Sequence, residues 1–111
     1  MLVVRFRRDS RQRLSSVLAA GHAEQGEPGE DIACAAVSAL LQAAWAGLSE
    51  VAGVPVEGRR RSGDLLMRWP EEARGRTDVH AIVATAELAI EQIAKQYRGA
   101  IRCVREAEPP T

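Results

Sequence analysis

Apolar side chains recur at every second position at the start of the chain, at Leu2, Val4 and Phe6. This alternation predicts a strand over residues 2–7, then the turn sequence RDSRQ and a returning strand over residues 14–20. The hairpin carries five arginines, Arg5, Arg7, Arg8, Arg11 and Arg13. We expect a solvated sheet edge that resists strand-to-strand association. The alternative is a basic surface for RNA or an acidic partner, but it lacks the interleaved aromatic side chains of a typical RNA-binding sheet.

Small and apolar residues run almost all round a helix predicted over residues 31–52. Val37, Leu41 and Leu48 recur there at helical spacings, and a helix of this composition is buried on most sides. In a small domain, such a helix also suggests a dimer interface. We expect Trp45 to belong to the core or to that interface.

A second hairpin is predicted from the strand-like residues 54–61 and 65–69, which the turn sequence SGD separates. Three arginines, Arg59, Arg60 and Arg61, are expected to make its tip soluble; contact with a protein or RNA is the alternative. The following segment, EEARGR, is expected to be a polar linker.

Apolar residues three or four apart from Val79 to Tyr97 predict an amphipathic helix, and residues 100–104 a last strand. The order strand, strand, helix, strand, strand, helix, strand gives an α+β fold, with two helices packed on a mixed, mostly antiparallel sheet. We expect a single domain over residues 1–105 and a frayed C-terminal tail over residues 106–111.

Composition and charge exclude several classes of protein. With 46 % hydrophobic and 27 % charged residues, the 111-residue chain is too apolar to be disordered. Its 15 basic and 15 acidic residues cancel, so no overall field attracts nucleic acid or a membrane. Two cysteines cannot form a disulfide framework, and Arg5 interrupts any signal peptide. No stretch approaches the roughly 20 apolar residues of a membrane span, so we expect a soluble cytoplasmic protein with reduced thiols.

The residues with the clearest chemistry, His22 and Cys34, flank a glycine-rich loop. With Asp31 as the helix N-cap, Cys34 falls in the first turn, where free N–H groups and the helix dipole favour a thiolate. The loop can bring the imidazole to the sulfur, and we expect residues 23–30 to be mobile without substrate and to close over it. Its hinge glycines are Gly21, Gly26 and Gly29.

Two residues are candidates for supporting roles. Asp31 either caps the helix or orients the imidazole, and capping is slightly favoured. Ser38 lies one turn after Cys34 on the same face, where it either lines the site or bonds back to the preceding turn. We expect His80 and Cys103 to be structural.

Spacing alone leaves other roles open for Cys34. A cysteine in an alanine-rich helix is commonly a small buried hydrophobe. A zinc ion would be under-coordinated by His22, Cys34 and Asp31, so no metal or other cofactor is expected. The loop also lacks the glycine and lysine patterns of nucleotide-binding loops.

The string GHA, followed after the loop by DIACAAVSAL, resembles the bacterial ribosomal-processing cysteine proteases called Prp, in which a cysteine follows a histidine by twelve positions. The resemblance implies an endopeptidase that removes a short N-terminal extension, aromatic before the scissile bond, from the large-subunit ribosomal protein numbered twenty-seven. It further implies a homodimer, with His22 as general base and Cys34 as nucleophile.

The chain departs from the family inside the loop, where EQGEPG stands in place of aromatic residues. Its acidic side chains would favour a basic peptide beside the cut site. The alternative function is a non-catalytic, ribosome-associated binding module with Cys34 buried. The protease hypothesis requires no contact with nucleic acid.

Overall fold

The computed structural model describes residues 1–22 and 29–109 of the chain. Two long helices and five strands follow one another in the predicted order, so the α+β prediction is confirmed. The elements are β1 (Leu2–Arg8), β2 (Leu14–Ala20), α1 (Glu30–Ala46), the π-helical turn η1 (Gly47–Val51), β3 (Glu57–Arg61), β4 (Asp64–Arg68), α2 (Glu71–Arg74), α3 (Thr77–Gln96) and β5 (Ile101–Ala107).

The five strands form one mixed sheet in the order β3-β4-β2-β1-β5. Strands β1 and β5 are parallel, and the other neighbours are antiparallel. Strand β1 is therefore interior, and the prediction that the first hairpin forms a solvated edge is wrong. Arg5 and Arg7 of this hairpin are paired instead, since both donate to Glu106 of β5, at 2.7 and 2.8 Å.

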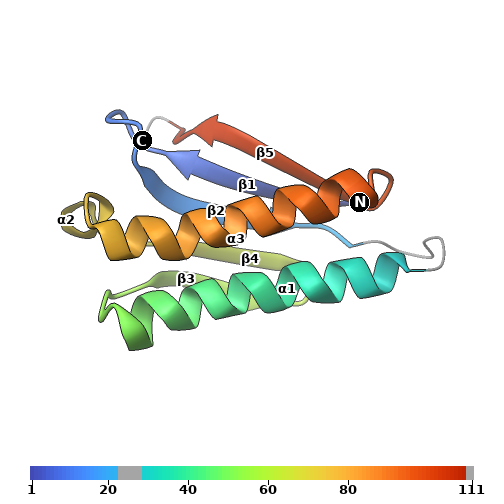
Figure 1. Ribbon diagram of the computed structural model, residues 1–111, viewed down its shortest axis with the longest axis horizontal. Helices are drawn as coiled ribbons and strands as arrows, with labels where there is room; N and C mark the ends of the chain where they lie inside the picture. Colours follow the sequence, from blue (N-terminus) through green and yellow to red (C-terminus); the bar gives the residue numbers. More distant parts are fainter. Residues whose placement is uncertain (23–28, 110–111) are drawn as a thin grey trace.

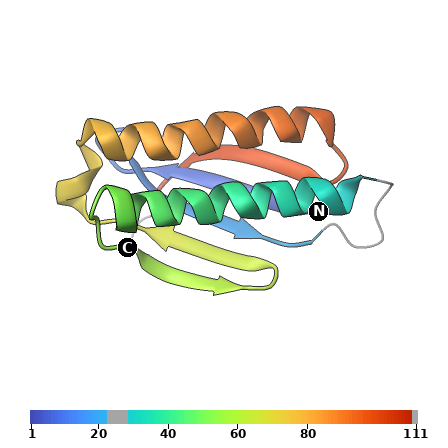
Figure 2. The same ribbon diagram turned by 60° about the horizontal axis from the view of Figure 1, so that its bottom comes forward.

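Both long helices cover the same face of the sheet and run antiparallel to each other (Figures 1 and 2). They approach closely at Gly47, where a β-carbon would lie 3.1 Å from Cγ2 of Ile82. The alternation of β1 buries Val4 and Phe6 completely on that face. The predicted stripe of α3 meets them with its fully buried members, Val79, Val83 and Ile90.

Helix α1 and its π-helical extension span residues 30–51, close to the predicted 31–52, but they are more apolar than the sequence analysis allowed. The segment Asp31–Val51, 21 residues with a mean hydropathy of 1.6, is long and apolar enough to cross a membrane by length and composition. The expectation that no stretch approaches this limit is therefore wrong. Core helices pass the same test, and Val37, Leu41 and Leu48 of this helix are at most 2 % exposed in the core.

Two segments that were expected to be irregular are ordered. The expected polar linker contains the single-turn helix α2. The expected tail begins inside β5, which runs to Ala107, and Glu108 then donates its backbone N–H to the carbonyl of Arg8 at 2.8 Å. The Glu108 carboxylate also accepts hydrogen bonds from the hydroxyls of Ser15 and Ser16. Residues 110 and 111 of that tail lie outside the described residues.

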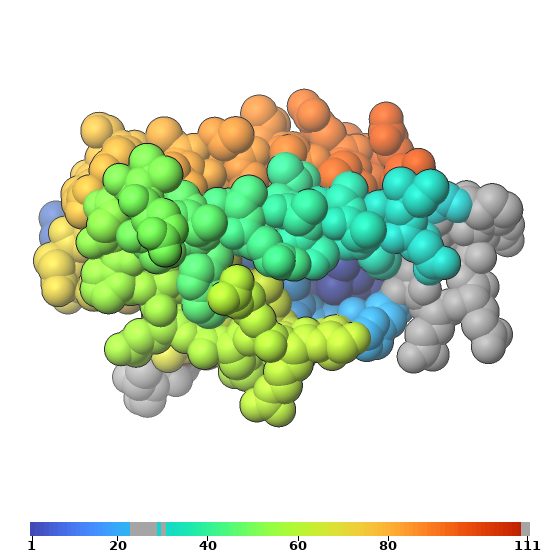
Figure 3. Space-filling model, turned by 90° about the horizontal axis from the view of Figure 1, so that it is seen from below, coloured from blue at the N-terminus to red at the C-terminus, as the bar shows by residue number. Residues whose placement is uncertain are grey.

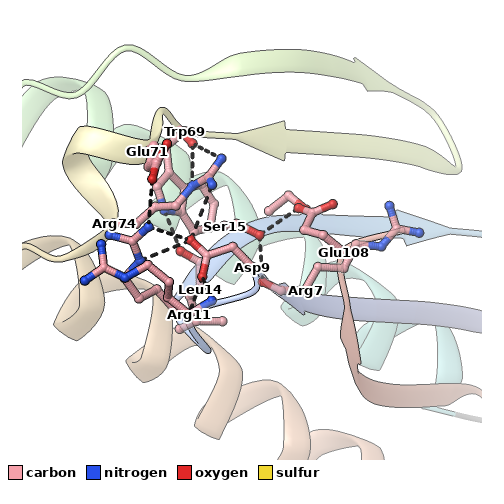
Figure 4. Close-up of polar contacts among 11 residues, drawn as sticks. Arg7, Asp9, Arg11, Leu14, Ser15, Trp69, Glu71, Arg74 and Glu108 are labelled. Atoms are coloured by element: carbon pink, nitrogen blue, oxygen red, sulfur yellow. Dashed lines mark hydrogen bonds and ion pairs between the residues drawn. The ribbon is translucent and has the colours of Figure 1, made fainter. Parts of the chain in front are cut away.

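A polar network closes the end of the sheet where β1 turns into β2 (Figure 4). Asp9 accepts hydrogen bonds from the backbone and side chain of Arg13 and pairs with Arg74. Arg74 also donates to the carbonyl of Trp69, whose indole N–H donates to Leu14 at 3.0 Å. Partial burial opposes ionisation, but the bonds from Arg13 outweigh it and lower the pKa of Asp9 to about 2.

Candidate active site

A cavity of about 630 Å³ opens between α1 and the β3–β4 hairpin. Figure 3 looks into this hollow: α1 forms one wall, the hairpin forms the other, and the first strands are visible at its floor. Apolar side chains line its depth, namely Leu2, Ala19, Val37, Leu41 and Leu65. Polar and charged residues, including Gln42, Arg60, Arg61 and Asp64, add hydrogen-bonding groups.

Five candidate residues from the sequence line this one cavity: Gly21, His22, Asp31, Cys34 and Ser38. The first two follow β2, and the other three belong to α1. Of the other two hinge glycines, Gly29 stands at the start of α1, whereas Gly26 lies outside the described residues. Most of the loop expected to be mobile, residues 23–28, also lies outside them.

Cys34 sits two residues, or about half a turn, deeper in α1 than predicted. The helix begins at Glu30, and its N-cap is Gly29, whose φ of 96° is left-handed and easily adopted by glycine. Tyr97 packs against this glycine, since a β-carbon there would lie 3.3 Å from the ring. Cys34 is thus the fifth helical residue, at the edge of the region where the helix dipole acts strongly.

Asp31 does not cap the helix, and the prediction that it is the N-cap is wrong. It is the second helical residue, and the N-cap position makes no side-chain hydrogen bond. Its side chain is exposed and lines the cavity.

One stripe of α1 faces the cavity, with a residue at every fourth position: Cys34, Ser38 and Gln42. Cys34 is half-buried, and Ser38 is exposed. The Ser38 hydroxyl accepts a hydrogen bond from the Gln42 side-chain amide at 2.9 Å. A substrate in the cavity would therefore meet a thiol, a hydroxyl and an amide in a row.

His22 is held by its backbone while its side chain remains exposed. The N–H of Gly21 donates to the carbonyl of Gly63 at 2.9 Å. The Met1 ammonium donates to the carbonyl of His22 at 2.7 Å. These bonds fix the chain on both sides of the histidine α-carbon.

Sequence reasoning missed the second wall of the cavity, because the hairpin was expected mainly to be a solubilising tip, with protein or RNA contact as the alternative. There the Arg60 guanidinium lies 4.7 Å from the ring centroid of Trp45 on α1, a cation–π contact across the two walls. Asp64 pairs with Arg59 at 2.6 Å. The missing information was the sheet order: once β4 is paired with β2, Asp64 lies opposite Ala20 and the turn lies beside His22.

The other cysteine and histidine lie elsewhere. Cys103 is half-buried in β5, and burial together with the nearby Glu91 and Glu87 raises the pKa of its thiol to about 11. His80 is exposed on α3. Among the described residues, no three His, Cys, Asp or Glu side chains are grouped so that they could hold a metal ion.

The family model described as cysteine protease Prp matches residues 1–102 of this chain. The chain belongs to the Prp family. The resemblance indicated by the strings GHA and DIACAAVSAL is therefore confirmed over almost the whole sequence. No curated protein is significantly similar to this Prp family member.

Solved structures share the fold of this Prp family member. The ribosomal processing protease Prp from S. aureus with a substrate peptide gives a TM-score of 0.83 at 21 % identity, covering 95 % of this chain and 99 % of that one. Its complex with a covalently linked product peptide gives 0.82 at 22 % identity and the same coverage. SMU.848 from Streptococcus mutans gives 0.81 at 25 % identity, covering 97 % of this chain and 96 % of that one.

Proposed function

We propose that this Prp family member uses Cys34 as nucleophile and His22 as general base to remove the N-terminal extension of the large-subunit ribosomal protein numbered twenty-seven. The observation that carries the dyad is the shared cavity, which brings together residues from two separate elements. Its volume of about 630 Å³ suits a short stretch of extended peptide. The substrate is supported by the S. aureus protein of the same fold, which is a ribosomal processing protease.

The proposed reaction is acyl transfer. The imidazole of His22 takes the proton of the Cys34 thiol, and the thiolate sulfur attacks the scissile carbonyl carbon. The tetrahedral intermediate collapses as the C–N bond breaks, and His22 returns the proton to the leaving amine. Water then hydrolyses the thioester and frees the thiol.

The first turn of α1 offers donors for the developing oxyanion. The first helical hydrogen bond runs from Ala33 to the carbonyl of Gly29 at 3.0 Å, so the N–H groups of residues 30–32 have no acceptor within the helix. Losing one donor of this kind costs on the order of 3 kcal/mol of transition-state stabilisation.

Because Asp31 does not cap the helix, we propose that it orients the imidazole of His22. Asp31→Asn and Asp31→Ala are then both expected to lower kcat by about tenfold or more, since neither retains the carboxylate. Full activity in Asp31→Asn would contradict this role. Ser38 is proposed to donate a hydrogen bond to a substrate carbonyl, and Ser38→Ala should raise KM more than it lowers kcat.

The direct test is cleavage of a peptide that spans the N-terminal extension of the organism's own ribosomal protein. Wild type should cut it once, while Cys34→Ala and His22→Ala, each checked for folding by circular dichroism, should not. Cleavage that persists in Cys34→Ala would contradict the dyad. No cleavage by folded wild type, with Cys34 also unreactive to iodoacetamide, would favour the non-catalytic binding module.

We also propose a homodimer formed through the outer face of α1. That face is apolar: Ile32 is 72 % exposed, Val51 at its far end is 82 % exposed, and exposed alanines lie between them. Ala43→Arg should therefore convert dimer to monomer in sedimentation equilibrium, whereas Gln92→Arg on the exposed side of α3 should not. A monomeric wild type at about 100 times the concentration of the cleavage assay would contradict the dimer.

A further inference from the structure

The turn between β3 and β4 contacts His22 at Gly63. A β-carbon at Gly63 would lie 2.1 Å from Nε2 of His22, 2.5 Å from Cε1 and 2.8 Å from Cδ2. All three are ring atoms, and all three distances are shorter than any normal contact of a β-carbon. The imidazole therefore occupies the space that a side chain at Gly63 would need.

The same turn also fixes the backbone that carries the imidazole. The carbonyl of Gly63 accepts a hydrogen bond from the N–H of Gly21 at 2.9 Å. Ala20, which precedes Gly21, is paired in the sheet with Asp64, which follows Gly63. One glycine thus holds the chain before His22 and provides the surface on which its ring rests.

We propose that Gly63 is a positioning residue, whose missing side chain sets where the imidazole of His22 lies in the cavity. This inference rests on the proposed dyad for its effect on catalysis. Displacing a catalytic group by about 1 Å can cost on the order of 100-fold in rate. Because the His22 side chain is exposed, a methyl group at position 63 would push the ring aside rather than distort the sheet.

The chain offers a matched control for Gly63→Ala. Gly63 has a φ of 74°, so alanine there is strained whatever the space around it. Gly53 has a φ of 67° with nothing within 4 Å of a built β-carbon, and it follows α1 and η1, away from the cavity. Gly53→Ala therefore imposes the same backbone strain without touching His22.

The test measures kcat and KM for peptide cleavage. Gly63→Ala should lower kcat by about tenfold or more with KM changed by less than about threefold, whereas Gly53→Ala should keep kcat within about twofold of wild type. Equal kcat values in the two variants would overturn the proposal.

A second readout does not depend on activity. The chain has two histidines, so NMR of the ring carbons should show the His22 signals shifting in Gly63→Ala while those of His80 stay fixed. Unchanged His22 signals in Gly63→Ala would overturn the positioning role, even if wild type cleaves the peptide. If the signals shift but wild type does not cleave the peptide, only the proposed function is contradicted. If Gly63→Ala does not fold, His22→Ala/Gly63→Ala decides: a folded double variant supports the contact, and an unfolded one overturns it.

Discussion

The two ends of strand β2 are built in opposite ways. At the Leu14 end, charged side chains neutralise one another around Asp9, and the indole of Trp69 is buried and hydrogen-bonded. At the other end, the chain is fixed by backbone hydrogen bonds to Gly21 and His22, while the cavity side chains remain accessible. The two ends therefore separate two tasks along one strand: buried packing and paired charges stabilise the fold at one end, and the proposed catalytic groups lie beside an open cavity at the other.

The two tryptophans give the largest test of this separation. Trp69 is 1 % exposed at the network end. Trp69→Ala should lower the free energy of unfolding by about 3–5 kcal/mol, because it leaves a void in the core and removes the hydrogen bond to Leu14. Trp45 is half-buried beside the cavity, so Trp45→Ala should cost only about 1–2 kcal/mol. Urea unfolding at one fixed protein concentration measures the free energy of unfolding of both variants. Equal losses of stability would contradict the difference between the two ends of β2.

The two thiols test the accessibility of the cavity end. Because the pKa of Cys103 is raised to about 11, fewer than about one in a thousand of its thiols is ionised at pH 7.5. We expect iodoacetamide to modify wild type at least about tenfold faster than Cys34→Ala. The matched variant Cys103→Ala should react as fast as wild type. A slow reaction of Cys103→Ala would show that Cys103, and not Cys34, is the reactive thiol.

Acid should weaken the network end selectively. The pKa of Asp9 is lowered to about 2 in the folded protein, from an ordinary value of 3.8. Its ionised form therefore stabilises the fold above about pH 4, and this stabilisation is lost as pH falls from 4 to 2. Asp9→Asn should cost about 1–2 kcal/mol at pH 7, and the difference from wild type should shrink towards pH 2.

Urea unfolding at pH 7, 4 and 2.5 follows this difference. Glu72→Gln, a charge change at an exposed position of α2, is the control and should leave the pH dependence as in wild type. If the difference in free energy of unfolding between Asp9→Asn and wild type stays constant down to pH 2.5, the role of the ionised carboxylate is contradicted.

The smallest effect is expected at the contact between Arg60 and Trp45. Arg60→Gln removes the cation–π contact and should lower the free energy of unfolding by about 0.5–1 kcal/mol. Arg61→Gln changes the same charge one residue further along and should cost less than that. Equal costs for the two variants would show that the contact does not join the cavity walls.

The sequence predicted the order of strands and long helices because their periodicities are local. It did not predict that β1 is interior, because that depends on pairing with β5, about 100 residues away. The N-cap prediction for Asp31 failed because Gly29 adopts the left-handed conformation and packs on Tyr97, a tertiary contact that outweighs the capping preference of aspartate.

The candidate site was predictable in part for the same reason. His22, Cys34 and Ser38 are linked by loop length and helical spacing, which are visible in the sequence. Gly63 reaches them only through the pairing of β4 with β2, so no local pattern marked it. The short α2 was missed because a single turn has no periodicity to detect, and it is held by the bonds from Arg74 to Trp69.

The parallel pairing of β1 with β5 also bears on the order in which the molecule is assembled. The ion pair between Arg5 and Glu106 joins residues 101 positions apart, and such distant pairing forms late because it closes a long loop. Every described residue that lines the cavity, by contrast, lies between Leu2 and Leu65. During synthesis from the N-terminus, the residues that line the cavity are therefore made well before β5, so the sheet behind the cavity is complete only once β5 has docked.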